Sequence, residues 1–491
     1  MTADRLRNGT AKFRQRAMLA ATVLLAVTLA GCKLSNDERI YVDPIRPAAA
    51  TRANSADAAI GEREHPKIVT TYGGIYENRA LEKRLGPVVA RLVSASDDPS
   101  QPYRVTILNS PTVNAFALPG GYLYVTRGLL ALAGDTSEVA AVLAHEIAHV
   151  TMRHAIERED RAKAAAVASQ VVADVLNDEA KARATLAASE LELASFSRSQ
   201  ELQADAIGVR TIARAGFDPY AAARFLKAMD RFADLAKAGT DKNPDFLSSH
   251  PSTPERVQRA VEQARQHGPA GSGLVDRDGY LDALDGMLFG DDPGEGYVRG
   301  QSFVHPGLGI TFTASSDYSL QNTAKAVLGT AADDTALRFD SIDVPGGQPL
   351  ATYLGSGWMN GLEAESVSPA TINGMEAATA IARSDGWNFR VAVIRDGTQT
   401  YRFIFAARQL TATVDSKALA TINSFRRLTP TEAARIRPLR IRAVTVAAGD
   451  TAEKLSARMA TANRYATFLV LNGLEPGTDP APGTKVKIVT Y

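Results

Sequence analysis

His145-Glu146-Ile147-Ala148-His149 specifies a chemistry as well as a local structure, because its two histidines are separated by about one helical turn. Side chains four positions apart on a helix point from the same face, close enough to hold a single metal ion. The glutamate follows the first histidine directly. A buried helix with such polar side chains needs partners for them, and a metal ion provides those partners. We therefore expect a core helix that carries a metal site.

A helix is predicted over residues 139–156, where alanine is abundant and neither Gly nor Pro occurs. Asp135 and Glu138 precede it at the spacing of a capping box, with Asp in place of Ser or Thr. Apolar residues recur at helical spacing along the segment, which indicates that one face is buried. Long helices are also expected within 159–215, which contains no Pro and no Gly before Gly208.

The motif has the H-E-x-x-H pattern of zinc peptidases. Zinc lowers the pKa of a bound water from about 16 toward about 7, so Glu146 can take a proton from that water at neutral pH. Zinc bound by His145 and His149 needs a third protein ligand, and Glu201 on the next predicted helix is the best candidate. Asp205, one turn further, can fix the tautomer of a ligating histidine. The alternative is a surface helix that carries two histidines by chance.

Composition limits the classes to which the chain can belong. With 491 residues it is too long for one core, so two to four domains are expected. Lys and Arg number 55 against 54 Asp and Glu, a balance that gives no indication of nucleic-acid binding. The single cysteine, Cys32, excludes an intramolecular disulfide and a thiolate zinc cluster.

The N-terminal segment has the pattern of a lipoprotein signal peptide. Basic residues precede 17–31, which is uncharged and mostly apolar but short for a membrane span. Leu29-Ala30-Gly31-Cys32 then resembles the bacterial lipobox, which implies a lipid anchor on Cys32. Lys33 follows where aspartate would have indicated inner-membrane retention, so this resemblance favours the outer membrane, facing the periplasm. The alternative is a plain secretory signal with an incidental cysteine.

We expect a multidomain α+β chain with a mainly helical metallopeptidase domain, a small α+β domain and a short C-terminal module. The expected boundaries are 1–31 for the signal peptide, 32–66 for a flexible tether, 67–268 for the metallopeptidase domain, 269–299 for a Gly- and Pro-rich linker, 300–430 for an α+β domain, and 440–491 for the C-terminal module.

A short β passage interrupts the helical region. Residues 103–108 and 122–126 are strand-like and flank 114–121, where Pro119 confines the segment to a sheet edge or a strand end. An edge strand can accept an extended peptide as an added strand, so we expect it to hold substrate. The residues assigned to this role are Asn114, Ala115, Phe116 and Ala117. A purely structural hairpin is the alternative.

The C-terminal third gives no cluster of titratable residues, so binding or scaffolding is the expected role of 300–430. Strands are predicted at 309–314, 336–344, 389–394 and 401–406, and helices at 349–359 and 416–424. The last fifty residues read as a separate β-α-α-β unit that resembles a LysM domain. The resemblance implies binding of N-acetylglucosamine polymers such as peptidoglycan; a related fold without sugar binding is the alternative.

The H-E-x-x-H motif followed by Glu201-Leu202-Gln203-Ala204-Asp205 resembles the HtpX/BepA-like zinc peptidases, gluzincins with H-E-x-x-H and E-x-x-x-D. By this resemblance one zinc ion is bound by two histidines and Glu201. It also implies a general-base role for Glu146 and a supporting role for Asp205. The resemblance covers roughly residues 70–265. The sequence shows neither the membrane helices of HtpX nor the repeats of BepA, so the resemblance does not imply the substrates of those proteins.

Two further segments carry the resemblance. Residues 114–121 resemble the active-site edge strand of the family, and 249–256 resemble its Ser-His-Pro-x-x-x-x-Arg motif. The motif implies that His250 lies near the zinc, where it either stabilises an oxyanion or closes the site as a temporary fourth ligand. Arg256 then positions His250 or an acidic partner. His154 is expected to be solvated and away from the metal face.

These observations predict a lipid-anchored periplasmic zinc endopeptidase that acts on misfolded or unassembled envelope proteins. Its expected partners are these substrate proteins and peptidoglycan, which the C-terminal module would bind. The lipid anchor would be its only attachment to the membrane. One alternative is a periplasmic chaperone or assembly factor whose protease site is latched by His250 and rarely active. Another is a structural lipoprotein that binds peptidoglycan.

Overall fold

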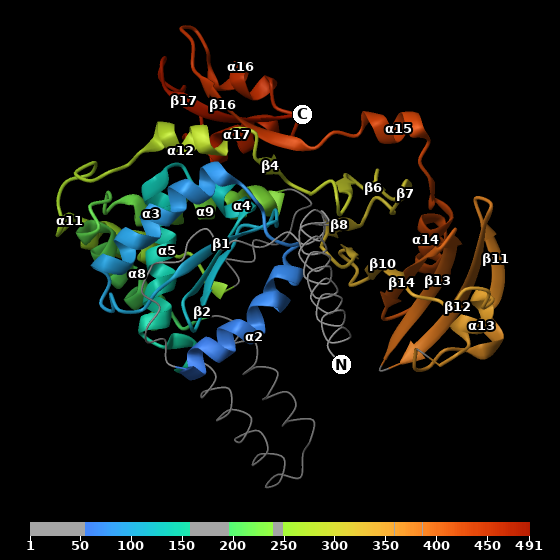
Figure 1. Cartoon of the computed structure of the whole chain (residues 1–491). Coiled ribbons are helices and arrows are strands. Elements are labelled where there is room, and N and C mark those ends of the chain that lie inside the picture. The colour runs from blue at the N-terminus through green and yellow to red at the C-terminus, as the bar shows by residue number, and fades with distance from the viewer. Residues whose placement is uncertain (1–54, 158–195, 239–248, 358, 385) are drawn as a thin grey trace, which may run out of the picture. The chain divides into compact units, whose positions relative to one another are not determined.

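The computed structural model describes residues 55–157, 196–238 and 249–491, except 358 and 385 (Figure 1). The expected signal peptide, the lipidation site Cys32, the first part of the tether and the residues 158–195 lie outside these ranges. None of the helices in the described ranges is long and apolar enough to cross a membrane.

Helix α2 (Ser55–Thr71) occupies part of the segment that was expected to be a flexible tether up to residue 66. That expectation is wrong from Ser55 onward, because apolar residues at the end of this helix pack on the first sheet. Ile68 and Val69 contact the cluster around Tyr122 and Tyr124. The helix therefore belongs to the folded part of the chain.

The first sheet supplies the expected edge strand. Its strands are β1 (Arg104–Leu108), β2 (Ala115–Leu118) and β3 (Tyr122–Thr126), in the order β1-β3-β2. β1 runs parallel to β3 and β2 runs antiparallel to it, so β2 lies at the sheet edge. Gly120 and Gly121 both have φ of 85°, the left-handed conformation that lets β2 turn back into β3.

Helices surround this sheet, and α5 (Thr136–Thr151) lies in their core. The others are α3 (Arg79–Ala95), α4 (Arg127–Leu132), α8 (Arg198–Arg214), α9 (Ala221–Ala238) and α11 (Pro254–Arg265). α5 ends at Thr151, and the helix predicted to run unbroken to residue 156 is interrupted by a turn at 152–153 before residues 154–157 become helical again. Arg153, with φ of 56°, turns the chain after the helix. A sequence without Gly or Pro does not show this break.

The expected linker at 269–299 contains part of the peptidase core, so that expectation is wrong over much of its length. Helix α12 (Arg277–Leu284) and strand β4 (Leu288–Phe289) lie within it. The buried side chains that join the core here are Tyr280, Leu281, Leu284 and Met287. Gly and Pro residues flank this short apolar segment, and their abundance masks its burial.

The α+β domain contains two antiparallel sheets, with strand orders β15-β7-β6-β5 and β11-β12-β13-β14-β10-β9-β8. The strands are β5 (Tyr297–Arg299), β6 (Ser302–His305), β7 (Ile310–Thr313), β8 (Ser319–Asn322), β9 (Val327–Thr330), β10 (Ala336–Ile342), β11 (Ser368–Ile372), β12 (Met375–Ser384), β13 (Trp387–Asp396), β14 (Gln399–Ala407) and β15 (Arg426–Arg427). The helices are α13 (Leu350–Leu354), the 3-10 helix η2 (Ala364–Ser366), α14 (Ala412–Asn423) and α15 (Pro430–Arg435).

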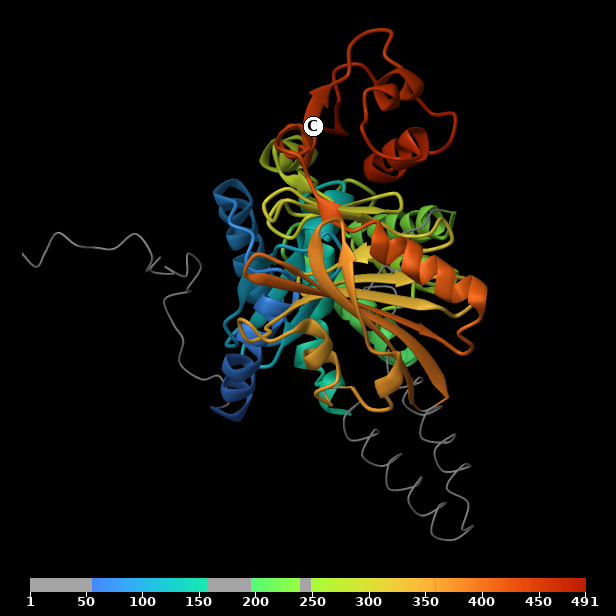
Figure 2. The ribbon, with the colours of Figure 1, turned by 90° about the vertical axis from the view of Figure 1, so that its right-hand side faces the viewer.

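Both faces of the larger sheet are covered. Ala378 and Val391 pack with α13 residues on one face, whereas their neighbours Ala377 and Ala392 join the cluster that includes α14 on the other. Alternate residues of a strand point to opposite faces, so one sheet serves two small cores. Figure 2 shows α14 (orange) beside this sheet.

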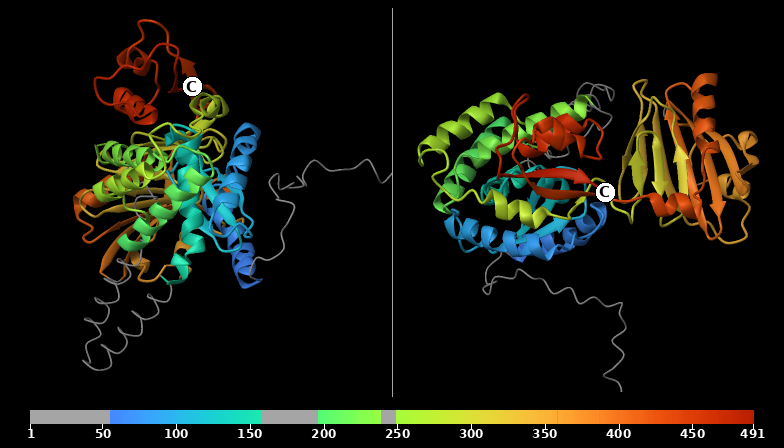
Figure 3. Two further views of the ribbon diagram at one scale, coloured as in Figure 1. Left: turned by 90° about the vertical axis from the view of Figure 1, so that its left-hand side faces the viewer. Right: turned by 90° about the horizontal axis from the view of Figure 1, so that it is seen from above.

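The C-terminal segment has the predicted β-α-α-β order: β16 (Leu439–Thr445), α16 (Ala452–Ala457), α17 (Arg464–Asn472) and β17 (Lys485–Thr490). The expectation of a separate unit is wrong, because Phe468 and Ile488 belong to the same buried cluster as the peptidase helices. β16 also pairs with β4, and both C-terminal strands lie beside α12 (Figure 3).

Candidate metal centre

Helix α5 supplies two candidate metal ligands, His145 and His149. Both are buried, and their Nε2 atoms lie 2.9 Å apart. Asp135 caps the helix by accepting a hydrogen bond from the backbone N–H of Glu138 at 2.9 Å. The Glu138 carboxylate accepts from the Gly134 N–H, so the expected box is not reciprocal. The cap fixes where α5 begins and hence which residues face the centre.

Helix α8 supplies the carboxylate. Its first turn is held by a capping box between Ser197 and Gln200, and Glu201 follows directly. The Glu201 oxygens lie 3.6 Å from the Nε2 atom of His145 and 3.5 Å from that of His149. The cap thus fixes the turn on which the third candidate ligand sits.

His250 completes the group from the segment before α11. Its Nδ1 lies 2.9 Å from Glu201 Oε1 and 3.3 Å from His145 Nε2. One ligand atom from each of His145, His149, Glu201 and His250 lies within 4.8 Å of the others, and all four side chains are buried. Residues from three distant parts of the sequence therefore converge on one point.

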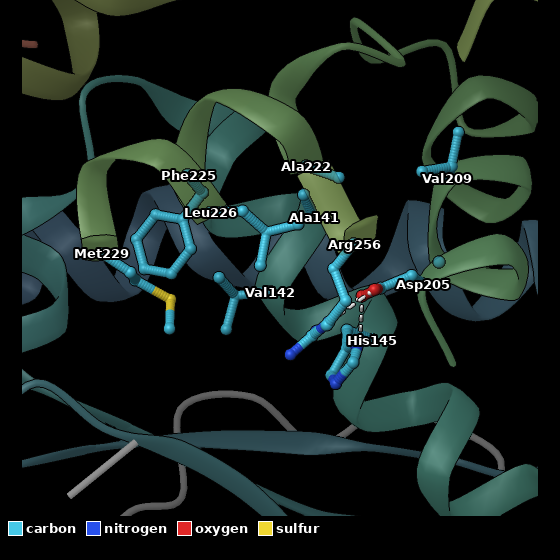
Figure 4. Close-up of a pocket in the computed structure, with 11 residues that line it drawn as sticks. Ala141, Val142, His145, Asp205, Val209, Ala222, Phe225, Leu226, Met229 and Arg256 are labelled. Atoms are coloured by element: carbon cyan, nitrogen blue, oxygen red, sulfur yellow. Dashed lines mark hydrogen bonds and ion pairs between the residues drawn. The ribbon is translucent and has the colours of Figure 1, made fainter. Parts of the chain in front are cut away.

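Asp205 and Arg256 support this group from behind. Asp205 Oδ1 accepts a hydrogen bond from His145 Nδ1 at 3.0 Å, and Arg256 donates to both Asp205 oxygens at 2.7 Å (Figure 4). Arg256 also lies 2.7 Å from Glu201 Oε2. Burial alone would raise the pKa of Asp205, but the hydrogen bonds from Arg256 and His145 outweigh burial and lower it. Asp205 is therefore a carboxylate at neutral pH.

The donor chemistry fits a zinc ion. Burial lowers the pKa of both His145 and His149, so both imidazoles are neutral at pH 7, as a metal ligand must be. Because Asp205 accepts the proton of His145 Nδ1, the Nε2 atom of that ring carries a lone pair. Two imidazole nitrogens and a carboxylate oxygen, facing one another in a buried site, are a donor set that zinc takes.

A small cavity of about 30 Å³ lies behind His145, between the centre and helix α9 (Figure 4). Its walls include the Asp205–Arg256 pair and the apolar side chains of Phe225 and Met229. Ion pairs next to apolar walls are weakly screened by solvent. The apolar walls of the cavity therefore strengthen the ion pair that orients His145.

Glu146 points to the other side of the centre. It is 2% exposed, and among the described residues its Oε1 has no hydrogen-bond partner. His250 Nε2 lies 3.7 Å from this oxygen. Burial, and then the charge of Glu201, raises the pKa of Glu146 well above its ordinary value. A buried carboxylate oxygen without a partner is costly, so it indicates a group kept for a ligand or reactant.

A cavity of about 790 Å³ opens on this side. Glu146, His149 and His250 line it, together with residues of the edge strand and of the α2 region; these are Asn114, Phe116, Ala117, Leu118, Ile68 and Tyr72. The structure therefore places three of the four predicted edge-strand residues on the cavity wall. Ala115 is the exception, because its side chain faces the core and is fully buried.

Comparison with known proteins identifies the helical region. Residues 79–264 match peptidase family M48. These residues form an M48 peptidase domain. M48 peptidases are zinc-dependent metallopeptidases, and the M48 domain here presents a buried group of three histidines and a glutamate that suits zinc.

Relatives of the M48 domain include beta-barrel assembly-enhancing proteases. That of Yersinia pestis is 31% identical over 232 residues, which are 45% of this chain and 46% of the relative. That of Escherichia coli (strain K12) is 32% identical over 198 residues, covering 38% and 40%. The mitochondrial metalloendopeptidase OMA1 of Schizosaccharomyces pombe is 33% identical over 175 residues, covering 36% and 50%. The match thus spans half or less of each relative.

One residue of the M48 domain contradicts its prediction. His154 was expected to be solvated, but it is 1% exposed and its Nδ1 lies 2.9 Å from His149 Nδ1. Its Nε2 lies 3.0 Å from Gln203 Oε1. The prediction assumed a continuous helix, whereas the turn at Arg153 folds His154 back toward α5. No signal in the sequence pointed to Gln203, which lies between the two acidic residues of the second motif.

Proposed function

We propose that this chain is a periplasmic zinc endopeptidase that cleaves misfolded or unassembled envelope proteins. One observation carries the proposal: Glu146, whose Oε1 has no hydrogen-bond partner among the described residues, lies beside a zinc-type donor set and faces a cavity bordered by an edge strand. A metalloendopeptidase needs these three parts together. The names of the relatives and the lipobox at Cys32 support the class of substrate and the location.

Each residue then has a distinct task. A zinc ion held by His145, His149 and Glu201 would supply Lewis-acid activation of a water and of the scissile carbonyl. Glu146 accepts the proton of the attacking water and returns it to the leaving amine. The edge strand β2 orients the substrate chain by pairing with it.

His250 gives the resting site a fourth protein donor. Catalytic zinc sites keep three protein ligands and one open position, whereas structural sites are closed by four. Since His250 Nδ1 lies among the other donors, we propose that His250 closes the site at rest and withdraws when substrate enters. A permanent closure would instead make the chain an assembly factor with a latched protease site.

The test compares zinc content and cleavage of an unfolded protein by the full chain and two variants. Glu146→Gln should retain one zinc per chain and lose at least about 10²-fold in kcat/KM, the range for a positioned general base. His250→Ala should retain zinc and cleave as fast as or faster than the unchanged chain.

Two results would refute the peptidase: no zinc in the unchanged chain, or full activity in Glu146→Gln. Zinc without cleavage in the unchanged chain, together with cleavage by His250→Ala, would favour the latched assembly factor.

Peptidoglycan binding is a second candidate function, which the β-α-α-β order of 439–490 favours. Thr451 caps the first helix, and Gly473, with φ of 65°, ends the second, as the LysM resemblance implies. Co-sedimentation of the full chain with purified peptidoglycan tests this function. Retention that free N-acetylglucosamine oligomers compete away is expected, and recovery in the supernatant would refute it.

A further inference from the structure

The geometry points to a further positioning residue: we propose that His154 sets the tautomer of His149 so that His149 Nε2 faces the zinc as a lone-pair donor. The inference rests on the proposed zinc site and adds a residue to it. His145 has a carboxylate, Asp205, to take its Nδ1 proton. For His149, the corresponding contact is the ring nitrogen of His154, at 2.9 Å.

The direction of this hydrogen bond decides which nitrogen of His149 can bind metal. A neutral imidazole carries one proton, so only one of two facing Nδ1 atoms can donate. If His149 donates, its Nε2 is free for zinc, and the proton of His154 is on Nε2. If His154 donates, His149 Nε2 is protonated and points its hydrogen at the other ligands.

Gln203 favours the productive direction. Its Oε1 lies 3.0 Å from His154 Nε2, and an amide oxygen can only accept a hydrogen bond. A proton on His154 Nε2 leaves Nδ1 as the acceptor that His149 needs. The three side chains thus form a relay of two hydrogen bonds. His149 Nδ1 donates to His154 Nδ1, and His154 Nε2 donates to Gln203 Oε1.

The fold holds the two rings in place. His154 is 1% exposed, and its ring meets that of His149 at 75°, edge to face, with centroids 4.9 Å apart. Phe196 stacks on His149 at 4.0 Å. The positive φ at Arg153 directs His154 back to this position just after α5 ends. Packing therefore fixes the orientation of the His149 ring, and the hydrogen bond with His154 fixes its tautomer.

Two substitutions separate this role from packing. His154→Leu fills similar space but offers no acceptor, whereas His154→Asn places an amide oxygen near the position of Nδ1. The exposed His267 provides a matched control, His267→Leu. For each full-length variant, the zinc dissociation constant is measured by competition with a chromophoric chelator. The absorption spectrum of the cobalt-substituted protein and kcat/KM are measured in parallel.

His154→Leu should weaken zinc binding about 10- to 100-fold and shift the cobalt spectrum, as loss of a partner that orients a metal ligand does. His154→Asn should recover most of the affinity, and His267→Leu should bind as the unchanged chain does. A folded His154→Leu with zinc affinity within about twofold of the unchanged chain would overturn the inference, and so would an Asn variant no better than Leu.

Gln203→Leu covers the case in which His154→Leu does not fold, because Gln203 lies at the exposed end of the relay. It should weaken zinc binding several-fold, and unchanged affinity would overturn the relay. An unchanged chain that binds no zinc at all would overturn the proposed function and this inference together. Zinc binding by the unchanged chain with the same affinity in the variants would overturn only the inference.

Discussion

Arg256 compensates two acidic side chains in the interior of the M48 domain. It is 3% exposed, donates to both oxygens of Asp205, and lies 2.7 Å from Glu201. Burial would lower its pKa, but the hydrogen bond and charge of Asp205 outweigh burial and raise it, so it stays cationic. Without this cation, the buried carboxylates of Asp205 and Glu201 would lose the positive charge that both contact.

Arg256→Leu should therefore lower the free energy of unfolding by about 3–5 kcal/mol, the cost of breaking a buried ion pair by removing one partner. Urea denaturation of the zinc-free protein measures this change. Arg259→Leu, exposed on the same helix, is the control and should change stability by about 0.5 kcal/mol or less. Equal stability of the two variants would show that Arg256 does not compensate buried charge.

At the scale of elements, the metal group depends on how closely α5 and α8 approach. Gly208 of α8 lies against the backbone of His145, and a Cβ atom there would meet His145 N at 3.3 Å. The missing side chain lets α8 bring Glu201 and Asp205 within reach of the histidines. A side chain larger than that of alanine must push the helices apart, because it would meet backbone atoms of α5 and not the end of a flexible side chain.

Gly208→Leu should weaken zinc binding at least about 10-fold and destabilise the fold by about 1–3 kcal/mol through overpacking. Gly208→Ala is the matched control, since its Cβ needs a shift of only a few tenths of an ångström and alanine favours a helix. Chelator competition and thermal unfolding give both quantities. Zinc affinity in Gly208→Leu equal to that of Gly208→Ala would show that the close approach of α5 and α8 does not hold the metal group together.

Sequence patterns located the elements whose signal is local. The sequence predicts the cap and apolar face of α5, the edge strand near Pro119, and the placement of Glu201 and Asp205 on one helix. It does not predict the burial of His154, because that burial depends on a backbone turn at Arg153 that no Gly marks. Burial of α12 was missed too, since its partners come from other segments and Gly-rich stretches surround it.

At the scale of the whole molecule, Lys487 ties the C-terminal segment to the M48 domain. Its side chain is completely buried, and its Nζ lies within hydrogen-bonding distance of the carbonyl oxygens of Ala131, Leu132 and Ala133 at the end of α4. A lysine in a strand ordinarily reads as solvent-facing, which explains why this contact was not predicted. The carbonyls left unpaired at a helix end are satisfied by a residue more than 350 positions away.

This contact predicts a pH dependence of stability. Burial, then the charge of Arg277, lowers the pKa of Lys487 from 10.5 to about 7, against the opposing charges of Glu138 and Asp135. Between about pH 7 and pH 10.5 the unfolded chain therefore holds a proton that the folded chain has released. Stability must rise with pH in this window, with a slope approaching about 1.4 kcal/mol per pH unit for one proton.

Urea denaturation at several pH values from 7 to 9.5 measures the slope, and Lys487→Met should remove it. Lys485→Met is the control, because Lys485 pairs with the exposed Asp282 on the same strand. Its slope should match that of the unchanged chain. A Lys487→Met variant that keeps the full slope would show that another group causes it.

The zinc site is tested most directly by anomalous diffraction at the zinc absorption edge from crystals of the zinc-loaded full chain. One peak is expected within bonding distance of His145 Nε2, His149 Nε2 and the Glu201 carboxylate, with Glu146 beside it and not bonded to it. A map without a peak among these atoms, or with its only peak elsewhere in the molecule, would show that these residues do not hold zinc.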